Sequence, residues 1–153
     1  MATGTVTNME QRVQTLSIEK EMEIAGSIDI VFETLLEQIG PLSETPDGEL
    51  IPMTLELWPG GRWYRDLGNG AGWCWGHVQV IEPPTLLELW GPHFLEYPAL
   101  VHLRYRLTEK GDTTLLAFTY CVIGQIEEAD RVTVGRCELM QRVRHAAERR
   151  SLR

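Results

Sequence analysis

The sequence predicts an α+β fold in which a curved antiparallel sheet of seven strands surrounds a long C-terminal helix. Seven runs between residues 16 and 124 alternate apolar and polar side chains or are rich in β-branched and aromatic residues, as strands are. Short connections join the last six runs. Such connections make antiparallel hairpins, because parallel strands need long crossovers.

The first third of the chain predicts a strand, a helix and a loop. Residues 16–25, LSIEKEMEIA, alternate in the manner of a half-buried strand. Ser27 is placed to cap a short helix with one apolar face, and Gly40 with Pro41 ends it. Residues 40–52 hold three prolines and two glycines and predict a surface loop, of a length typical of lids at pocket mouths.

The middle of the chain predicts six further strands in close succession. Their expected ranges are 53–58, 62–67, 72–82, 85–91, 99–109 and 113–124. Pro59, Gly60 and Gly61 form the tight corner of the first hairpin, and later glycines give the sheet places to bend. A sheet of this size must cover its apolar face.

The last segment, residues 127–153, provides that cover. Val132, Leu139, Met140, Val143 and Ala147 fall on one side of a helix. It is the only expected element long enough to span the sheet.

Length and composition suit one soluble domain. The chain has 153 residues, 43% of them hydrophobic and 24% charged, which is ordinary for a globular protein able to bury a core without metal or disulfide. We expect a flexible N-terminus over residues 1–15 and a single domain over residues 16–150. No run is apolar enough for a membrane span or signal peptide, so a cytoplasmic location is expected.

The charge distribution argues against a nucleic-acid partner. The net charge is -8, but residues 1–130 hold 7 basic and 20 acidic side chains, whereas residues 131–153 hold 7 basic and 2 acidic ones. The acidic body would repel phosphate. The basic end is either a solvated helix face or a contact for an acidic partner.

No sequence motif supports a metal, a cofactor or a catalytic nucleophile. The three cysteines are far apart and form no Cys-x-x-Cys pair, and no His-x-His or His-Glu-x-x-His occurs. No Gly-x-Ser-x-Gly elbow or phosphate-binding glycine loop follows a strand. We therefore expect no metal or cofactor and assign no catalytic residue.

The segments WPGGRW, WGHVQVIEPPTLLELWG and VHLRYRLTEKGDTTLLAFTY, followed by a terminal helix, resemble the START-like or SRPBCC superfamily, whose fold is called helix-grip. The branch it most resembles is named after the activator of the ninety-kilodalton heat-shock protein ATPase. The resemblance covers about residues 16–147. The superfamily includes hydrophobe carriers, polyketide cyclases, hormone receptors and co-chaperones, so the resemblance implies a fold and leaves the function open.

Two departures from the family pattern bear on the pocket. The second short helix with a tryptophan that often follows the first is absent from residues 40–52, so the mouth is expected to differ. In the last helix the family often has Gly-Trp where this chain has Gly135 and Arg136, so the pocket need not be purely apolar.

Strand alternation and helix spacing give ten candidate ligand-binding residues on the inward faces. They are Leu57, Trp63, Arg65, Leu89, Leu103, Tyr105, Phe118, Tyr120, Arg136 and Met140. Apolar lining with sparse polar contacts is typical of small-molecule sites. The alternative is a core filled by these same side chains. Arg136 either points toward the cavity, where it would attract a carboxylate or phosphate, or reaches to the rim with its stem over the core.

Other features leave alternatives open. Acid–base chemistry of the cyclase kind would need an inward Tyr, His or Glu, and Tyr105, Tyr120 or Glu88 come into question, although Glu88 alternates toward solvent. Trp73 and Trp75, with Trp58 and Trp90, fall on the outward parity. This pattern indicates either a dimer interface or a bulge at Gly76 that turns one ring inward.

These observations favour non-enzymatic binding of a small hydrophobic or amphipathic molecule between sheet and helix. An interaction module of the co-chaperone kind, acting through the outer sheet surface, is the alternative from another class. A cyclase or hydrolase acting on a polyketide-like substrate is the third hypothesis.

Overall fold

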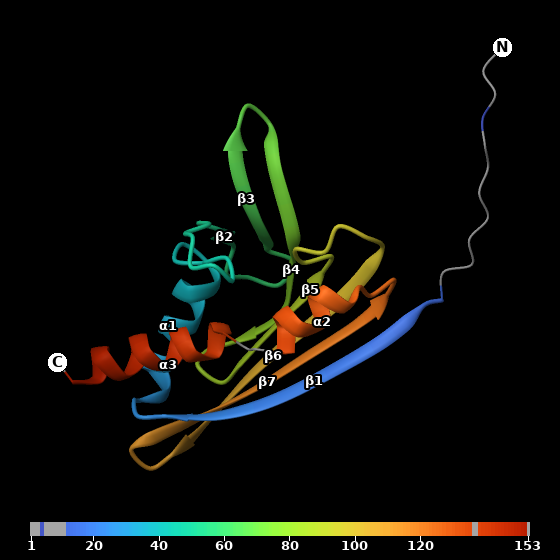
Figure 1. Cartoon of the computed structure of the whole chain (residues 1–153). Helices are drawn as coiled ribbons and strands as arrows, with labels where there is room; N and C mark the ends of the chain where they lie inside the picture. The colour runs from blue at the N-terminus through green and yellow to red at the C-terminus, as the bar shows by residue number, and fades with distance from the viewer. Residues whose placement is uncertain (1–3, 5–11, 136–137, 153) are drawn as a thin grey trace.

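The computed structural model of the chain describes residue 4 and residues 12–135 and 138–152. A seven-stranded antiparallel sheet curves across the molecule, and helices pack against its inner face (Figure 1). This is the α+β helix-grip architecture that the sequence predicts. The strands are β1 (Gln14–Ile24), β2 (Thr54–Leu55), β3 (Arg62–Gly68), β4 (Ala71–Glu82), β5 (Leu86–Gly91), β6 (Ala99–Lys110) and β7 (Thr113–Gly124).

The strand order is β1-β7-β6-β5-β4-β3-β2, so the first strand pairs with the last and all later neighbours are hairpins. The longest ladders join β7 to β1 and to β6, with unbroken registers along eleven and twelve residue pairs. The β3–β4 hairpin stands away from the rest of the molecule, and its tip points into solvent (Figure 1).

Helix α1 (Ile28–Ile39) begins where the sequence predicts. The Ser27 side chain accepts a hydrogen bond from the backbone N–H of Ile30 at 3.4 Å, and Gly40 caps the other end. Its buried face packs on α3 and on the inner side of β6 and β7. After it, residues 45–48 form the expected turn, in which the Gly48 N–H donates to the Thr45 carbonyl at 2.9 Å.

The expected C-terminal helix is described as two helices, α2 (Glu128–Gly135) and α3 (Glu138–Ser151). Residues 136–137 between them lie outside the described residues, and so does the candidate Arg136. Helix α3 is fastened to α1 by Arg150, whose Nη1 donates to Thr34 Oγ1 at 3.0 Å and to Glu37 Oε2 at 3.1 Å.

One half of the interior is a packed core. It lies where α1 and α3 cover the sheet, and its side chains are almost completely enclosed. The members of this half include Ile24, Val31, Phe32, Leu35, Leu107, Leu116, Val143 and Ala147. Burial of this apolar surface stabilises the fold.

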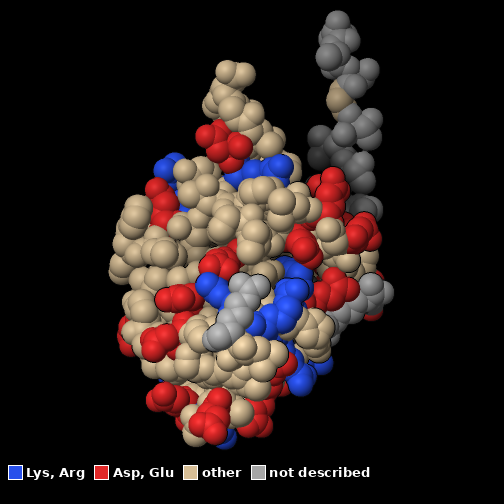
Figure 2. Space-filling model, turned by 90° about the vertical axis from the view of Figure 1, so that its left-hand side faces the viewer, with Lys and Arg blue, Asp and Glu red and all other residues tan. Residues whose placement is uncertain are grey.

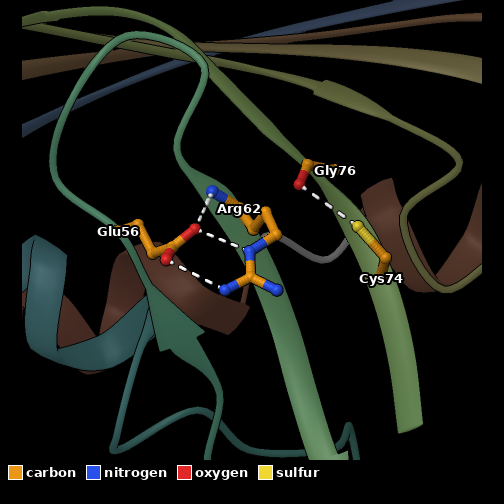
Figure 3. Close-up of polar contacts among 4 residues, drawn as sticks. All are labelled: Glu56, Arg62, Cys74 and Gly76. Carbon is orange, nitrogen blue, oxygen red and sulfur yellow. Dashed lines mark hydrogen bonds and ion pairs between the residues drawn. The ribbon is translucent and has the colours of Figure 1, made fainter. Parts of the chain in front are cut away.

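The first hairpin differs from the expectation. Strand β2 ends at Leu55 instead of the expected Trp58, and the turn begins at Glu56 rather than at Pro59. Glu56 Oε1 accepts from both the backbone N–H and the Nε of Arg62 at 2.8 Å, and Oε2 accepts from Nη2 at 3.1 Å (Figure 3). These bonds hold the pKa of the Glu56 carboxyl below its usual value.

The shorter strand overturns one inward-facing expectation. Leu57 lies in the turn and is 48% exposed, so it does not reach the interior. The corner itself requires glycine, because a Cβ on Gly61 would lie 2.1 Å from the carbonyl oxygen of Glu56. Gly60 and Gly61 pair with Val78 of β4 and so join the turn to the sheet.

A β-bulge in β4 reorients the tryptophans. Trp63 pairs with Gly76 but Tyr64 pairs with Cys74, so Trp75 is an extra residue on the β4 side. Its ring packs edge-on against Trp63 with centroids 5.2 Å apart. The sequence left open a dimer interface or a bulge that turns one tryptophan ring inward. For Trp75 the bulge is confirmed.

One face of the molecule shows how the charges are distributed. Basic and acidic side chains are interspersed there, with Lys and Arg near the middle and Asp and Glu around them (Figure 2). Among the described residues, no helix has the length and apolar character needed to cross a membrane.

Candidate functional site

The other half of the interior is an open cavity of about 770 Å³. Its floor is the inner face of β6 and β7, and its walls are the β3–β4 bulge, the C-terminal end of α1 and the start of α3. Two loops complete it, residues 40–52 and residues 92–98. This volume lies within the range of about 300–1,000 Å³ that is usual for ligand pockets.

Six of the ten candidate residues line this cavity, and aromatic rings predominate among them. They are Trp63, Leu103, Tyr105, Phe118, Tyr120 and Met140. All six are at most 8% exposed. Alternation on β6 and β7 brings four of them together on one floor, where Tyr105 stacks on Phe118 with ring centroids 5.1 Å apart.

Three other candidates do not line the cavity. Leu57 is exposed in the turn. Leu89 is fully enclosed in the packed core. Arg65 was expected to face inward, but its guanidinium lies over the ring of Trp73, 5.6 Å from the centroid, because the two residues are paired across the β3–β4 hairpin.

Trp63 connects the sheet to helix α1 at the cavity wall. Its indole Nε1–H donates to the carbonyl oxygen of Ile39 at 2.8 Å, and the side chain is 3% exposed. The last carbonyls of a helix have no partner within the helix, so this bond satisfies one of them. It also fixes the orientation of the ring toward the cavity.

His93 lies at the centre of an aromatic cluster that defines one end of the cavity. Its imidazole stacks on Trp63 with centroids 5.3 Å apart, meets Trp75 edge-on at 5.2 Å and lies 4.4 Å from Phe94. The centroid of Tyr120 is 6.0 Å away. The His93 backbone has φ +58°, in the left-handed region that histidine adopts more readily than most residues.

The imidazole of His93 has no polar neighbour. Its Nδ1 is buried and has no hydrogen-bond partner among the described residues. Burial lowers the pKa of His93 from its usual 6.5 to about 3, because the charged form would lose its hydration. The ring is therefore neutral throughout the physiological range.

The tyrosines beside this cluster are also held neutral. Burial is the main reason that the pKa of Tyr120 is raised, and Tyr97 and Asp130 raise it further. Tyr97 donates its hydroxyl to Asp130 Oδ2 at 2.7 Å, and burial and this bond raise its own pKa. No hydrogen bond of the Tyr120 hydroxyl occurs within the described part of the chain.

Three polar side chains meet at the side of the cavity where α1, α3 and the 40–52 loop come together. Arg142 donates from Nε to Gln38 Oε1 at 3.3 Å and lies 3.6 Å from Glu44 Oε2. The pair with Glu44 is the ion pair that joins the loop to α3 among the described residues. Partly exposed pairs of this kind contribute at most about 1 kcal/mol, so the loop is only weakly held there.

The cavity is electrostatically unfavourable to anions. The charged residues that line its described part are Glu44, Glu96, Glu138 and Arg142. The single guanidinium already has a carboxylate partner, so no described cation is left to compensate a bound anion. No group of three or more His, Cys, Asp or Glu side chains that could hold a metal occurs in the described residues.

The candidate Glu88 lies on the outer face, as does His102. Glu88 Oε1 is 4.0 Å from His102 Nε2 and 3.9 Å from Arg104 Nε, outside the cavity. The sequence expectation that Glu88 alternates outward is confirmed.

The polar residues that sequence reasoning missed come from segments without periodicity. His93 is in the 92–98 loop, where alternation gives no orientation, and Gln38 and Arg142 become neighbours only when α1 packs on α3. One signal was present: Phe94 and Leu95 are apolar residues in a loop, which indicates that the loop covers something.

No family model matches the sequence, and no curated protein matches it. The fold is shared with solved structures at low identity. An uncharacterised protein from Rhizobium leguminosarum superposes with a TM-score of 0.66 at 15% identity, covering 90% of this chain and 97% of that one. CalU16 from Micromonospora echinospora gives 0.56 at 21% identity, with coverages of 88% and 81%.

A third similar structure is the di-domain ARO/CYC protein StfQ from the steffimycin biosynthetic pathway. Its TM-score is 0.62 at 10% identity, and the match covers 91% of this chain and 52% of StfQ, about half of that protein. The likeness to proteins of this kind establishes the helix-grip fold for the chain, and at these identities it establishes the fold alone.

Proposed function

We propose that this protein binds a small hydrophobic or amphipathic molecule in the cavity between the sheet and helix α3. The observation that carries the proposal is the cavity itself, about 770 Å³ of open space walled by aromatic side chains. A folded chain normally fills its interior to crystal-like density, so an unfilled aromatic chamber of this size calls for an occupant.

A reaction of the ARO/CYC kind is supported less well. The proteins with the same fold include StfQ, and His93 and Tyr120 face each other across 6.0 Å in the cavity. An efficient general base has a pKa near the working pH, and burial holds that of His93 near 3. Both groups are thus suited to contact a neutral ligand rather than to transfer its protons.

A protein-interaction role is the second candidate. Trp58, Trp73 and Trp90 are 55%, 49% and 45% exposed, which is more aromatic surface than a monomer usually presents. A homodimer or another protein partner would cover such surface. Sedimentation velocity over a range of concentrations distinguishes a self-associating chain from a monomer.

The experiment that tests binding is a thermal-shift screen of the purified protein against fatty acids, sterols, flavonoids and polyketide-like aromatics. A ligand that binds only the folded state raises the melting temperature by mass action. We expect a shift of a few degrees with aromatic compounds and none with fatty acids.

Two substitutions on the same helix provide the control. Met140→Trp places a larger side chain into the cavity from α3, whereas His145→Trp adds the same ring on the exposed side of α3. Binding should be lost in the first variant and kept in the second, with both folded. Equal shifts in both variants, or no shift with any compound class in the unmodified protein, would remove the cavity as the binding site.

A further inference from the structure

The cavity has a polar side chain, set among aromatic rings, whose ring nitrogens make no hydrogen bond in the described chain. This is His93, and the inference below rests on the proposed binding function. Two other polar groups near the cavity are already paired: Arg142 has Glu44 and Gln38, and Tyr97 has Asp130. A side chain that lines a cavity and has an unused donor or acceptor can bind a polar group of a ligand.

The ring is held in place by aromatic contacts rather than by hydrogen bonds. Trp63 lies parallel to it at an interplanar angle of 25°, and Trp75 stands against it at 88°. Trp63 is itself anchored by its bond to Ile39. The imidazole therefore has a fixed position, and its polar edge is not needed to keep it there.

The accessible edge of the ring is its Nε2 side. Nδ1 is enclosed by protein atoms, while the residue as a whole is only half-buried and lines the cavity. Nε2 makes no hydrogen bond within the described residues either. A neutral imidazole carries one proton on either nitrogen, so Nε2 can present a donor or an acceptor to a molecule beside it.

The surroundings determine which polar group fits there. A carboxylate would be buried among aromatic rings in a cavity whose described charged lining is three glutamates and one arginine already paired with a glutamate. Burial of an unpaired anion is costly. An uncharged hydroxyl can both donate and accept, and a flat ring that bears it can stack beside Trp63 and Phe118.

We propose that His93 is the specificity-determining residue of the cavity, and that its Nε2 forms a hydrogen bond with an uncharged hydroxyl on an aromatic ligand while carboxylates are rejected. This assigns the ligand class as neutral hydroxyaromatic molecules. The ring of Tyr120 lies beside the same position, with its centroid 6.0 Å from that of His93.

The test compares three probes that share one ring system: naphthalene, 2-naphthol and 2-naphthoate. Isothermal titration calorimetry at pH 7 with the protein in the syringe gives their dissociation constants. We expect 2-naphthol to bind about 3- to 10-fold more tightly than naphthalene, as one buried hydrogen bond provides. We expect 2-naphthoate to bind at least about tenfold more weakly than naphthalene.

The variant His93→Phe keeps an aromatic ring and removes both nitrogens. The preference should reverse, with 2-naphthol binding about tenfold more weakly than naphthalene, because its hydroxyl is then buried without a partner. His102→Phe makes the same exchange on the outer face of β6 and should leave all three constants unchanged. Retained 2-naphthol preference in His93→Phe would overturn the inference.

A second variant and a direct observation cover the case in which phenylalanine does not tolerate the left-handed backbone. His93→Asn suits that conformation and removes the ring. It should lower affinity for 2-naphthol and reduce its preference over naphthalene. In the unmodified protein, long-range proton–nitrogen spectra of the imidazoles should show 2-naphthol shifting Nε2 of His93 and of no other histidine.

The outcomes separate the inference from the proposed function. Naphthalene binding without a 2-naphthol preference overturns the role of His93 and leaves the cavity as a binding site. Tighter binding of 2-naphthoate than of 2-naphthol overturns the assigned ligand class. If none of the three probes binds, the proposed function fails, and the inference fails with it.

Discussion

Replacement of His93 by asparagine should change how the stability of the protein depends on pH. In the folded protein the imidazole is packed among Trp63, Trp75, Phe94 and Tyr120, and burial lowers its pKa to about 3. In the unfolded chain it titrates near 6.5. Between these values the unfolded chain binds a proton that the folded protein excludes.

The sign of the effect follows from proton linkage. Where the unfolded state binds more protons, the free energy of unfolding rises with pH. The contribution of neutral His93 is thus fully present above about pH 6.5 and is lost as pH falls from there toward 3. Each pH unit in this window is worth at most about 1.4 kcal/mol, so acidification from pH 7.5 to 4.5 costs about 2–3 kcal/mol through this residue.

Asparagine cannot titrate, so His93→Asn should escape this loss. At pH 7.5 the variant should be less stable than the unmodified protein, since ring contacts are gone. At pH 4.5 that difference should shrink by about 2–3 kcal/mol, because the groups common to both proteins contribute alike and cancel. The imidazole ring of His93 remains partly accessible from the cavity, so about 3 kcal/mol is an upper limit for this change in the stability difference.

The assay is urea unfolding followed by tryptophan fluorescence at pH 7.5, 6.0 and 4.5, with linear extrapolation at each pH. His102→Asn removes an imidazole from the outer face and serves as the control for the loss of a histidine as such. Stability curves of His93→Asn and the unmodified protein that stay parallel within about 0.5 kcal/mol would show that His93 is protonated freely in the folded state. That result would refute the account of a desolvated ring.

Three further predictions test the fold around the cavity. Gly76→Ala should destabilise the protein by about 1–3 kcal/mol in urea unfolding, because its Cβ would lie 2.3 Å from a backbone carbonyl oxygen of β5; an unchanged midpoint would contradict the close approach. Arg142→Met should lower the free energy of unfolding by less than about 1 kcal/mol yet speed proteolysis near Glu44, and unchanged cleavage would argue that the ion pair does not hold the loop. Leu107→Ala should cost about 3 kcal/mol or more, and Leu103→Ala less, because only Leu103 borders space that is already open; equal losses would indicate a filled interior.

The extended elements could be predicted because their signals are local. Alternation located β1, β6 and β7 within about two residues, and the Ser27 cap located the start of α1. Where the pattern failed, side-chain hydrogen bonds across the hairpin decided the structure. The bond network of Glu56 with Arg62 ended β2 early and left Leu57 in the turn.

The sequence predicted the strand residues that form the floor of the cavity, but it did not predict the polar residues of the cavity. Tyr105, Phe118 and Tyr120 have the inward parity of long regular strands, and they line the cavity. Alternation cannot say which inward residues meet other side chains and which meet open space, so Leu89 was grouped with them although it is packed in the core.

By itself, the sequence determined which faces of the strands and helices are apolar, and therefore that a seven-stranded sheet closes against helices. The periodicity of side chains depends only on neighbouring residues, so it does not depend on how the rest of the chain folds. Only the tertiary structure decided that half of the interior is filled and half is open. The tertiary structure alone also decided that the bulge at Trp75 and the 92–98 loop bring His93 to the end of the cavity. A bulge reverses the alternation of a strand, and a loop has no periodicity from which the orientation of a side chain could be predicted.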